Sequence, residues 1–265
     1  MTSPSAISVS STIDSAIILQ KAAELAARLN LPLAQSLELA TTELVLAYTA
    51  KGLQLLHVPS SRGKSSCLLY IDFVHGKNGF RLARNATSKQ PLARAAGLKP
   101  GFRPTILDAT AGNGADGFVL ASLGSRVTMC ERSPIIGALL QDGLNRAAQQ
   151  QITAAIIDQY LTFKQLDSRE YLAQTKKTFH TIYLDPMYPE RQKSALNKQI
   201  LRTIRSLVGG DPDSANLLET ALAKAENRVV VKRPHHAPPL STLKPSHIIT
   251  MKNSRFDVYM TFNAK

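Results

Sequence analysis

The stretch that decides the fold is TILDATAGNGADGFVLASLGSRVTMCER, residues 105–132. A short apolar run ends at Asp108, and three glycines follow in the spacing G-x-G-x-x-G. Apolar residues then recur at helical spacing as far as Leu123, Gly124 ends the helix, and a second apolar run reaches Glu131. The order strand, glycine loop, helix and strand predicts half of a nucleotide-binding βαβ unit.

The glycine loop by itself allows more than one ligand. Its glycines fit the dinucleotide fingerprint, and Glu131, about 20 residues on, suits the ribose of a dinucleotide or of S-adenosylmethionine (SAM). The glycines could also turn the chain without binding anything. Two features favour SAM. Asp108 precedes the glycines, where methyltransferases often keep an acid, and the later motif Asp185-Pro-Met-Tyr has no role in a dehydrogenase.

The composition predicts a globular protein with a polyanionic partner. With 265 residues, 44% of them hydrophobic, the chain can bury a substantial core and fits one domain of ordinary size and a smaller one. The net charge of +13 favours nucleic acid as the partner, although a merely basic protein would show the same excess.

Several signals are absent from the sequence. Cys67 and Cys130 form no C-x-x-C pair, and His235-His236 has no third ligand at a suitable spacing, so we expect no metal site. The N-terminus lacks a secretory signal pattern, and no apolar run approaches the roughly 20 residues that span a bilayer. These absences predict a cytoplasmic protein without membrane contact.

The spacing of apolar residues divides the chain into two parts. Residues 1–100 carry an amphipathic helix and three strand-like runs, which predict a small N-terminal α/β domain. Residues 101–265 continue as helices and strands, with a central strand at 181–184. They end in two strands, 247–251 and 256–262, which no helix separates and which should pair antiparallel. Such a doubly wound, Rossmann-like α/β sheet is typical of class I SAM-dependent methyltransferases.

Polar side chains follow several predicted strands, and ligands of an open α/β sheet bind beyond the carboxyl ends of its strands. We therefore expect one crevice for a nucleoside cofactor. Glu131 can accept hydrogen bonds from ribose hydroxyls, Asp167 can accept from an adenine amino group, and Ser168 can donate. The expected cofactor residues are Asp108, Gly112, Gly114, Glu131, Asp167, Ser168 and Asp185.

The corner Asp185, Pro186, Met187 and Tyr188 closes the central strand and supplies the candidate catalytic residues. An exocyclic amine is a weak nucleophile because its lone pair is delocalised into the base. A carboxylate and a backbone carbonyl that accept its N–H groups can turn the lone pair toward a sulfonium, which is mainly a proximity effect. The ring of Tyr188 can stack on the base. The alternative is a strand-to-loop corner in which Asp185 bonds its own backbone.

Basic residues gather before and after these motifs. No acid occurs in residues 73–103, whereas seven lysines and arginines do, between Lys77 and Arg103. This basic run, 77–103, is either a phosphate-contacting surface or a solvated face. Lys232-Arg233 is expected to border the same edge as Asp185.

Five segments resemble, in order and spacing, the ribosomal RNA small subunit methyltransferase J family. They are DATAGNGADGFVLASLG, ERSPIIGALLQDGL, YLDPMYPERQKSALNKQ, VVVKRPHHAPPL and RFDVY, and they span residues 108–259. The N-terminal part resembles the family more loosely, chiefly at YIDF, residues 70–73. DPMYP followed by QKSAL is specific to the family, whereas the glycine loop is not.

The resemblance implies a SAM-dependent enzyme that methylates the exocyclic N2 of one guanine near the 3′ end of 16S ribosomal RNA. This RNA, or the small ribosomal subunit, is then the expected partner. The resemblance implies cofactor positions at Ala115-Asp116, Glu131-Arg132, Asp167-Ser168 and Asp185. Two of them depart from the family's pattern, because Ala115 stands where a basic residue is common and Asp167 where a serine is common.

Three alternatives stay open at this point. An adenine-N6 methyltransferase acting on DNA or RNA needs the same geometry around its target amine. A nicotinamide-dependent dehydrogenase would use the glycine loop for its dinucleotide. A non-catalytic RNA-binding assembly factor would keep the fold and the basic charge. In each case we expect a monomer.

Overall fold

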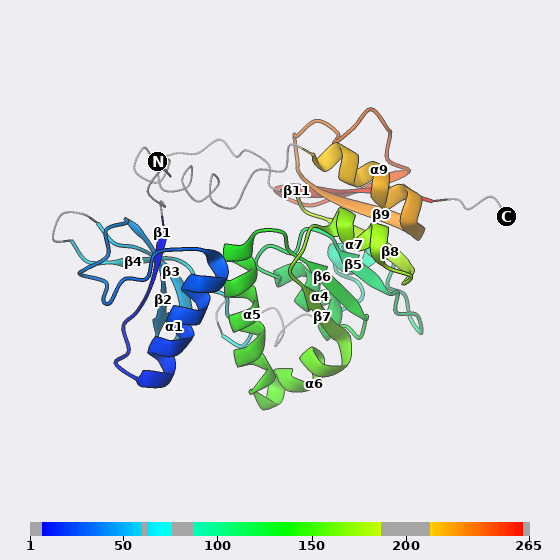
Figure 1. Ribbon diagram of the computed structural model, residues 1–265. Helices are drawn as coiled ribbons and strands as arrows, with labels where there is room; N and C mark the ends of the chain where they lie inside the picture. Colours follow the sequence, from blue (N-terminus) through cyan, green and yellow to red (C-terminus); the bar gives the residue numbers. More distant parts are fainter. Residues whose placement is uncertain (1–6, 60–62, 76–86, 187–212, 262–265) are drawn as a thin grey trace.

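The computed structural model describes residues 7–59, 63–75, 87–186 and 213–261. Two sheets lie side by side, a four-stranded one formed by the first part of the chain and a seven-stranded one formed by the rest (Figure 1). Helix α5 (Pro134–Ala148) stands between them and packs against β3 of the smaller sheet. The predicted boundary between residues 1–100 and 101–265 falls between the two sheets. That the two parts are separate domains stays a prediction.

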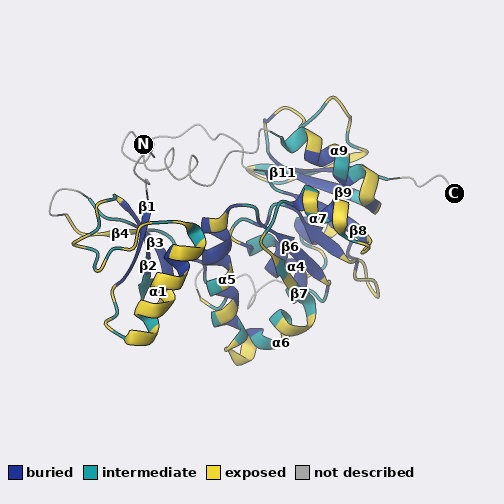
Figure 2. Ribbon diagram, in the orientation of Figure 1, coloured by how far each residue is buried: buried dark blue, intermediate teal, exposed yellow. Residues whose placement is uncertain are grey.

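The smaller sheet is mixed. Its order is β1 (Ile7–Ser11), β2 (Leu44–Thr49), β3 (Gly52–His57), β4 (Ser66–Leu69). β1 pairs parallel with β2, and the remaining pairs are antiparallel. Helix α1 (Ala16–Leu29) packs on β1 and β2 through its buried stripe and leaves its outer face exposed (Figure 2). This arrangement matches the expected small α/β unit.

The larger sheet is doubly wound. Its order is β10 (His247–Thr250), β11 (Ser254–Met260), β9 (Ala225–Pro234), β8 (Phe179–Leu184), β5 (Ile106–Asp108), β6 (Val127–Cys130), β7 (Leu161–Lys164). The five strands from β9 to β7 run parallel, and β10 and β11 form an antiparallel hairpin against β9. The predictions of a doubly wound sheet, a central strand at 181–184 (β8) and a terminal hairpin are confirmed.

Helices cover both faces of this sheet. Successive strand residues point to opposite faces, so Ile106 and Tyr183 belong to one hydrophobic cluster and Leu107 and Ile182 to another. The first cluster includes α3 (Pro91–Ala95), α4 (Ala115–Ser122), α5 and α6 (Gln151–Tyr160); the second includes α7 (Ser168–Gln174) and α9 (Ser214–Lys224). No helix within the described ranges is long and apolar enough to cross a membrane.

The segment after β4 connects the two sheets. Ile71 and Phe73 are buried in the cluster that also contains α4 and α5. The rings of Phe73 and Phe118 lie 4.6 Å apart, centroid to centroid. A Cβ on Gly143 of α5 would come within 2.8 Å of Ile71 Cγ2, so only a glycine permits this approach. The YIDF segment therefore fixes the smaller sheet against the helices that carry the glycine loop.

Candidate active site

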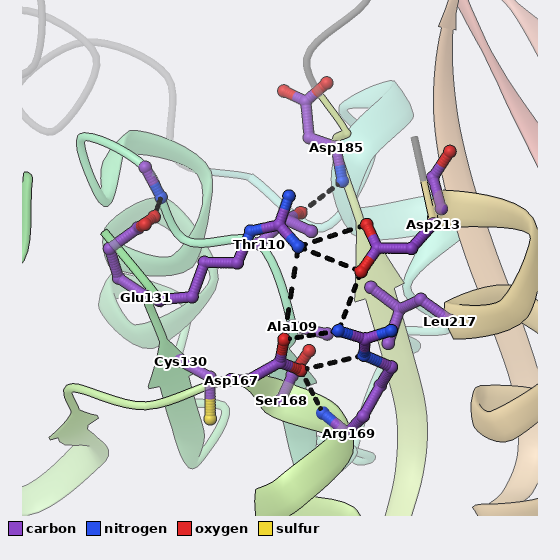
Figure 3. A pocket seen from close by; sticks show the side chains of 13 residues that line it. Ala109, Thr110, Cys130, Glu131, Asp167, Ser168, Arg169, Asp185, Asp213 and Leu217 are labelled. Carbon is purple, nitrogen blue, oxygen red and sulfur yellow. Dashed lines mark hydrogen bonds and ion pairs between the residues drawn. The ribbon is translucent and has the colours of Figure 1, made fainter. Parts of the chain in front are cut away.

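A cavity opens where the strand order of the larger sheet reverses. From β5 the chain proceeds outward to β6 and β7, then crosses to β8 on the other side of β5, and a crevice forms at such a point. The empty volume of the cavity is about 590 Å³, which includes space open to solvent. Figure 3 looks into it. Its walls are formed by Ala109, Thr110, Gly112, Cys130, Glu131, Arg132, Asp167, Ser168, Arg169, Asp185, Asp213, Ser214 and Leu217.

The three glycines of the loop differ in what surrounds them. Gly112 lines the cavity with a φ of 55°, and a Cβ placed there would meet no atom nearer than 3.9 Å. A Cβ on Gly114 would lie 2.7 Å from Leu140 Cδ1, and one on Gly117 would lie 2.7 Å from Met129 Sδ. Of the three, only Gly112 leaves open space beside the backbone for a ligand. The other two allow α4 to pack closely.

Glu131 follows β6 and fixes the glycine loop from the cavity wall. Its Oε2 accepts a hydrogen bond from the Gly112 N–H at 2.8 Å, and its Oε1 accepts one from the Ser133 N–H at 2.7 Å. The residue is only 8% exposed, and a carboxylate at such a position needs donors of this kind. Glu131 therefore shapes the loop and presents its carboxylate at the wall where the sequence predicts a ribose contact.

Four side chains form a continuous hydrogen-bonded network beside the cavity. Lys232 of β9 donates from Nζ to Asp185 Oδ2 at 2.7 Å and to Asp116 Oδ2 at 2.8 Å. The hydroxyl of Tyr183 donates to the same Asp116 oxygen at 2.7 Å. Burial lowers the pKa of Lys232, but the two carboxylates outweigh it and raise that pKa above its ordinary value, so the amine is charged.

Asp108 lies behind this network. The residue is 2% exposed, and burial together with the Asp116 carboxylate raises its pKa well above the ordinary value. It accepts a hydrogen bond from the Thr110 N–H at 3.3 Å. Asp108 thus supports the start of the glycine loop and does not belong to the cavity wall.

An ion-pair cluster occupies another part of the wall (Figure 3). Arg132 donates to both carboxylate oxygens of Asp213 at 3.0 Å, and Arg169 contacts the same carboxylate at 2.7 Å. Arg169 also hydrogen-bonds Asp167, which holds the pKa of Asp167 below its ordinary value. Asp167 is the N-cap of α7 and accepts from the Arg169 N–H. The cluster ties the end of β6 to the first residues of α7 and α9.

The structure brings most of the predicted cofactor residues to this one cavity. Six of them line it: Gly112, Glu131, Arg132, Asp167, Ser168 and Asp185. Four lie behind its wall or in α4: Asp108, Gly114, Ala115 and Asp116. Of the predicted catalytic corner, Asp185 reaches the cavity and Pro186 is buried. Met187 and Tyr188 lie outside the described residues.

Among the lining residues that the sequence does not predict, three join parts of the wall through their side chains. Thr110 Oγ1 accepts a hydrogen bond from the Asp185 N–H at 2.6 Å and so joins the Asp185 corner to the glycine loop. Arg169 and Asp213 belong to the ion-pair cluster. The sequence DSRE at 167–170 has an N-cap residue and a glutamate three positions on, a signature that places α7 and hence Arg169. No local signal reveals Asp213, because Arg132 is 81 residues away in the chain.

Two histidines follow β9 side by side. His235 and His236 lie with their Nδ1 atoms 3.3 Å apart on an exposed loop. In the part of the chain that the structure describes, no group of three or more His, Cys, Asp or Glu residues is arranged to hold a metal ion.

Known proteins similar to this chain identify its family. A family model described as "Putative SAM-dependent methyltransferase" matches residues 24–261. Ribosomal RNA small subunit methyltransferase J of Desulfotalea psychrophila is 54% identical over 244 residues, 92% of each chain. The protein of the same name from Thioalkalivibrio sulfidiphilus is 50% identical over 245 residues, 91% of this chain and 93% of the relative.

A solved structure agrees with these relatives. The crystal structure of the SAM-dependent methyltransferase NGO1261 from Neisseria gonorrhoeae is 29% identical, covers 97% of both chains and has a TM-score of 0.74 to this one. Strand order, glycine loop and sequence identity over nearly the whole chain lead to one conclusion. The protein belongs to the SAM-dependent methyltransferases and, among them, to the ribosomal RNA small subunit methyltransferase J family.

Proposed function

We propose that this protein transfers a methyl group from SAM to the exocyclic N2 of a guanine near the 3′ end of 16S ribosomal RNA. Family membership gives SAM as the donor. The name of the relatives and the net charge of +13 support small-subunit RNA as the substrate. The resemblance of DPMYP and QKSAL to the family supports the guanine N2 as the target atom.

The residues around the cavity fit this cofactor. The open space beside Gly112 suits a ligand that passes against the backbone. Glu131 and Asp167 offer carboxylates to hydroxyl and amino groups, and Leu217 offers apolar surface to a base. When bound, SAM supplies an electrophilic methyl group on a positively charged sulfonium. The carboxylate of Asp185 at the cavity wall suits such a positive charge.

The observation that carries the proposal is the position of Asp185. It follows the central strand β8, lines the cavity together with Gly112, and is joined to the glycine loop through Thr110. From there its carboxylate can accept a hydrogen bond from the target amine, and a backbone carbonyl of the Asp185-Pro186 corner can accept the other. With SAM bound, the carboxylate would also take the proton that the nitrogen loses when the methyl group passes from sulfur to nitrogen, which leaves the sulfur as a neutral thioether. Tyr188 is predicted to stack on the base.

The test is methyl transfer to RNA from a strain that lacks the enzyme. Purified protein, labelled SAM and small-subunit RNA or whole subunits are incubated, and the label in RNA is counted. Wild type should label the RNA and Asp185→Ala should not, although it unfolds at nearly the same temperature. Retained activity in the variant would remove Asp185 from the mechanism. RNA binding without any labelling by the wild type would favour an assembly factor, and label in adenine would favour N6 methylation.

A further inference from the structure

We propose that Lys232 is a positioning residue for methyl transfer, because its ammonium group holds the Asp185 carboxylate in one orientation and keeps it ionised. The inference rests on the proposed function, since it concerns how Asp185 receives the target amine. Nothing in the sequence assigns this lysine a role. It lies in the apolar run VVVKRP and is 47 residues from Asp185 in the chain.

Sheet register brings the two residues together. β8 and β9 run parallel, and Leu184 pairs with Val231. One step further along both strands, Asp185 and Lys232 therefore follow side by side at the carboxyl edge. Alternation places the Lys232 side chain on the face of Val230, which belongs to the same hydrophobic cluster as α4. This is the direction in which Asp116 lies.

The lysine is anchored on both sides. Its Nζ lies 2.8 Å from Asp116 Oδ2, and Asp116 is itself held by the Tyr183 hydroxyl at 2.7 Å. The Asp116 side chain is 14% exposed, whereas that of Asp185 is 39% exposed. The buried end of the network is thus fixed by packing. Lys232 extends this order to the Asp185 carboxylate through the 2.7 Å contact with Oδ2.

The positive charge of Lys232 is also needed, because it separates two carboxylates. Asp116 and Asp185 accept from the same ammonium, so without it two carboxylates would face each other across the gap that it fills. Among the described residues, Asp108 from β5 and Tyr183 from β8 interact electrostatically with both acids, and Glu131 after β6 acts on Asp108. None of these three is a cation. Removal of Lys232 therefore favours uptake of a proton by the acids, and a protonated Asp185 is a weaker hydrogen-bond acceptor that cannot take the proton of the amine.

The experiment compares Lys232→Met, Lys232→Arg and the control Lys224→Met. Lys224 is exposed at the end of α9, just before β9, and so lies at the opposite edge of the sheet. Single-turnover methyl transfer to small-subunit RNA is measured from about pH 4 to 9, a range that begins near the ordinary aspartate pKa of about 3.9. K232M should lower the rate about 10- to 100-fold and move the acidic limb of the profile to higher pH. K232R should keep the limb of the wild type, and K224M should match wild type throughout.

A double variant shows whether the lysine acts through Asp185. Adding K232M to Asp185→Asn should cause no further loss if its whole effect passes through that carboxylate; independent losses that multiply would overturn the inference. A K232M variant that keeps the rate and the acidic limb of the wild type would also overturn the inference. If K232M does not fold, Lys232→Gln is judged by the same two criteria. An inactive wild type would overturn the proposed function and this inference together, whereas an active wild type with an indifferent Lys232 overturns this inference alone.

Discussion

Gly112 and Gly114 are two residues apart in one loop, yet the first faces the cavity and the second faces packed side chains. Both have positive φ, so an alanine at either position is strained by about 1–2 kcal/mol. At Gly114 the new Cβ would also overlap Leu140 and press on Phe73. We expect Gly114→Ala to lose about 1–3 kcal/mol more stability than Gly112→Ala.

The same pair separates packing from binding. Gly112→Ala should weaken SAM binding in calorimetry because its methyl group enters the cavity, while its unfolding temperature falls less than that of Gly114→Ala. Equal losses of stability in the two variants would contradict the packing role of Gly114. Unchanged SAM affinity in Gly112→Ala would show that no ligand passes against this residue.

Asp108 gives a prediction for pH. Because burial raises its pKa, the folded protein keeps this proton at pH values where the unfolded chain, with a pKa of about 3.9, has released it. The folded state binds more protons in this window, so the contribution of Asp108 to stability falls as pH rises through it. We expect the free energy of unfolding of Asp108→Asn, relative to wild type, to increase from pH 4 upward until the raised pKa is passed. Urea denaturation of both proteins checks this; a pH-independent difference would contradict it.

Among the elements, the strands of the large sheet were predictable because each is a short apolar run bounded by polar residues or glycine. Their ends were less predictable. β9 begins at Ala225, which pairs with Phe179 of β8, and continues to Pro234, which pairs with Ser254 of β11. A local pattern cannot show how far a partner strand extends. Long-range pairing likewise places Lys232 in contact with Asp185, whereas the sequence predicts only that the two lie at the same edge.

Two helices, α6 and α7, were not predicted. α6 begins after Gln150 without a proline, a glycine or a side-chain cap to separate it from α5, so the sequence marks no boundary there. At α7 the signal is present in DSRE, but we predict only a strand end and cofactor contacts for Asp167 and Ser168, and no helix. Asp167 in fact caps the helix and binds Arg169, so part of the candidate site depends on a boundary that was overlooked.

The contact between α5 and the smaller sheet depends on one guanidinium. Arg146 donates from Nε to Asp142, from one terminal nitrogen to the Tyr70 hydroxyl and from the other to the Ile71 carbonyl; Asp142 also accepts from the Leu53 N–H. A lysine keeps the charge but cannot reach three acceptors in this fork geometry. We expect Arg146→Lys to lower the free energy of unfolding by about 1–3 kcal/mol. Urea denaturation measures it, with the exposed Arg28→Lys of α1 as control; equal stability of the two variants would contradict the role of this contact.

At the scale of the whole molecule, basic residues lie at the carboxyl edge of the larger sheet, where the candidate site is located. Residues 227–256 contain no acid but several lysines, arginines and histidines. Ser254 pairs with Pro234, so the turn before β11, including the exposed Lys252, lies at the carboxyl edge of the sheet. The predicted basic run at 77–103 lies partly outside the described residues, and its contact with RNA stays a prediction.

This placement predicts a salt-dependent contribution of the edge to RNA binding. Lys252→Glu should weaken binding of small-subunit RNA and reduce the slope of log K against log salt by about 1. Lys177→Glu, which makes the same change just before β8 at the opposite edge, should affect both less. Filter binding at several salt concentrations provides the measurement. Equal effects of the two changes would mean that RNA responds only to the net charge of the molecule.

The central claim is that a methyl group reaches an amine held at the Asp185 corner, and the identity of the methylated nucleoside tests it most directly. Small-subunit RNA from a strain lacking the enzyme is incubated with the protein and SAM, digested to nucleosides and analysed by mass spectrometry. The account predicts N2-methylguanosine with the wild type and none with Asp185→Ala. N6-methyladenosine, or N2-methylguanosine in equal amounts from both proteins, would contradict it.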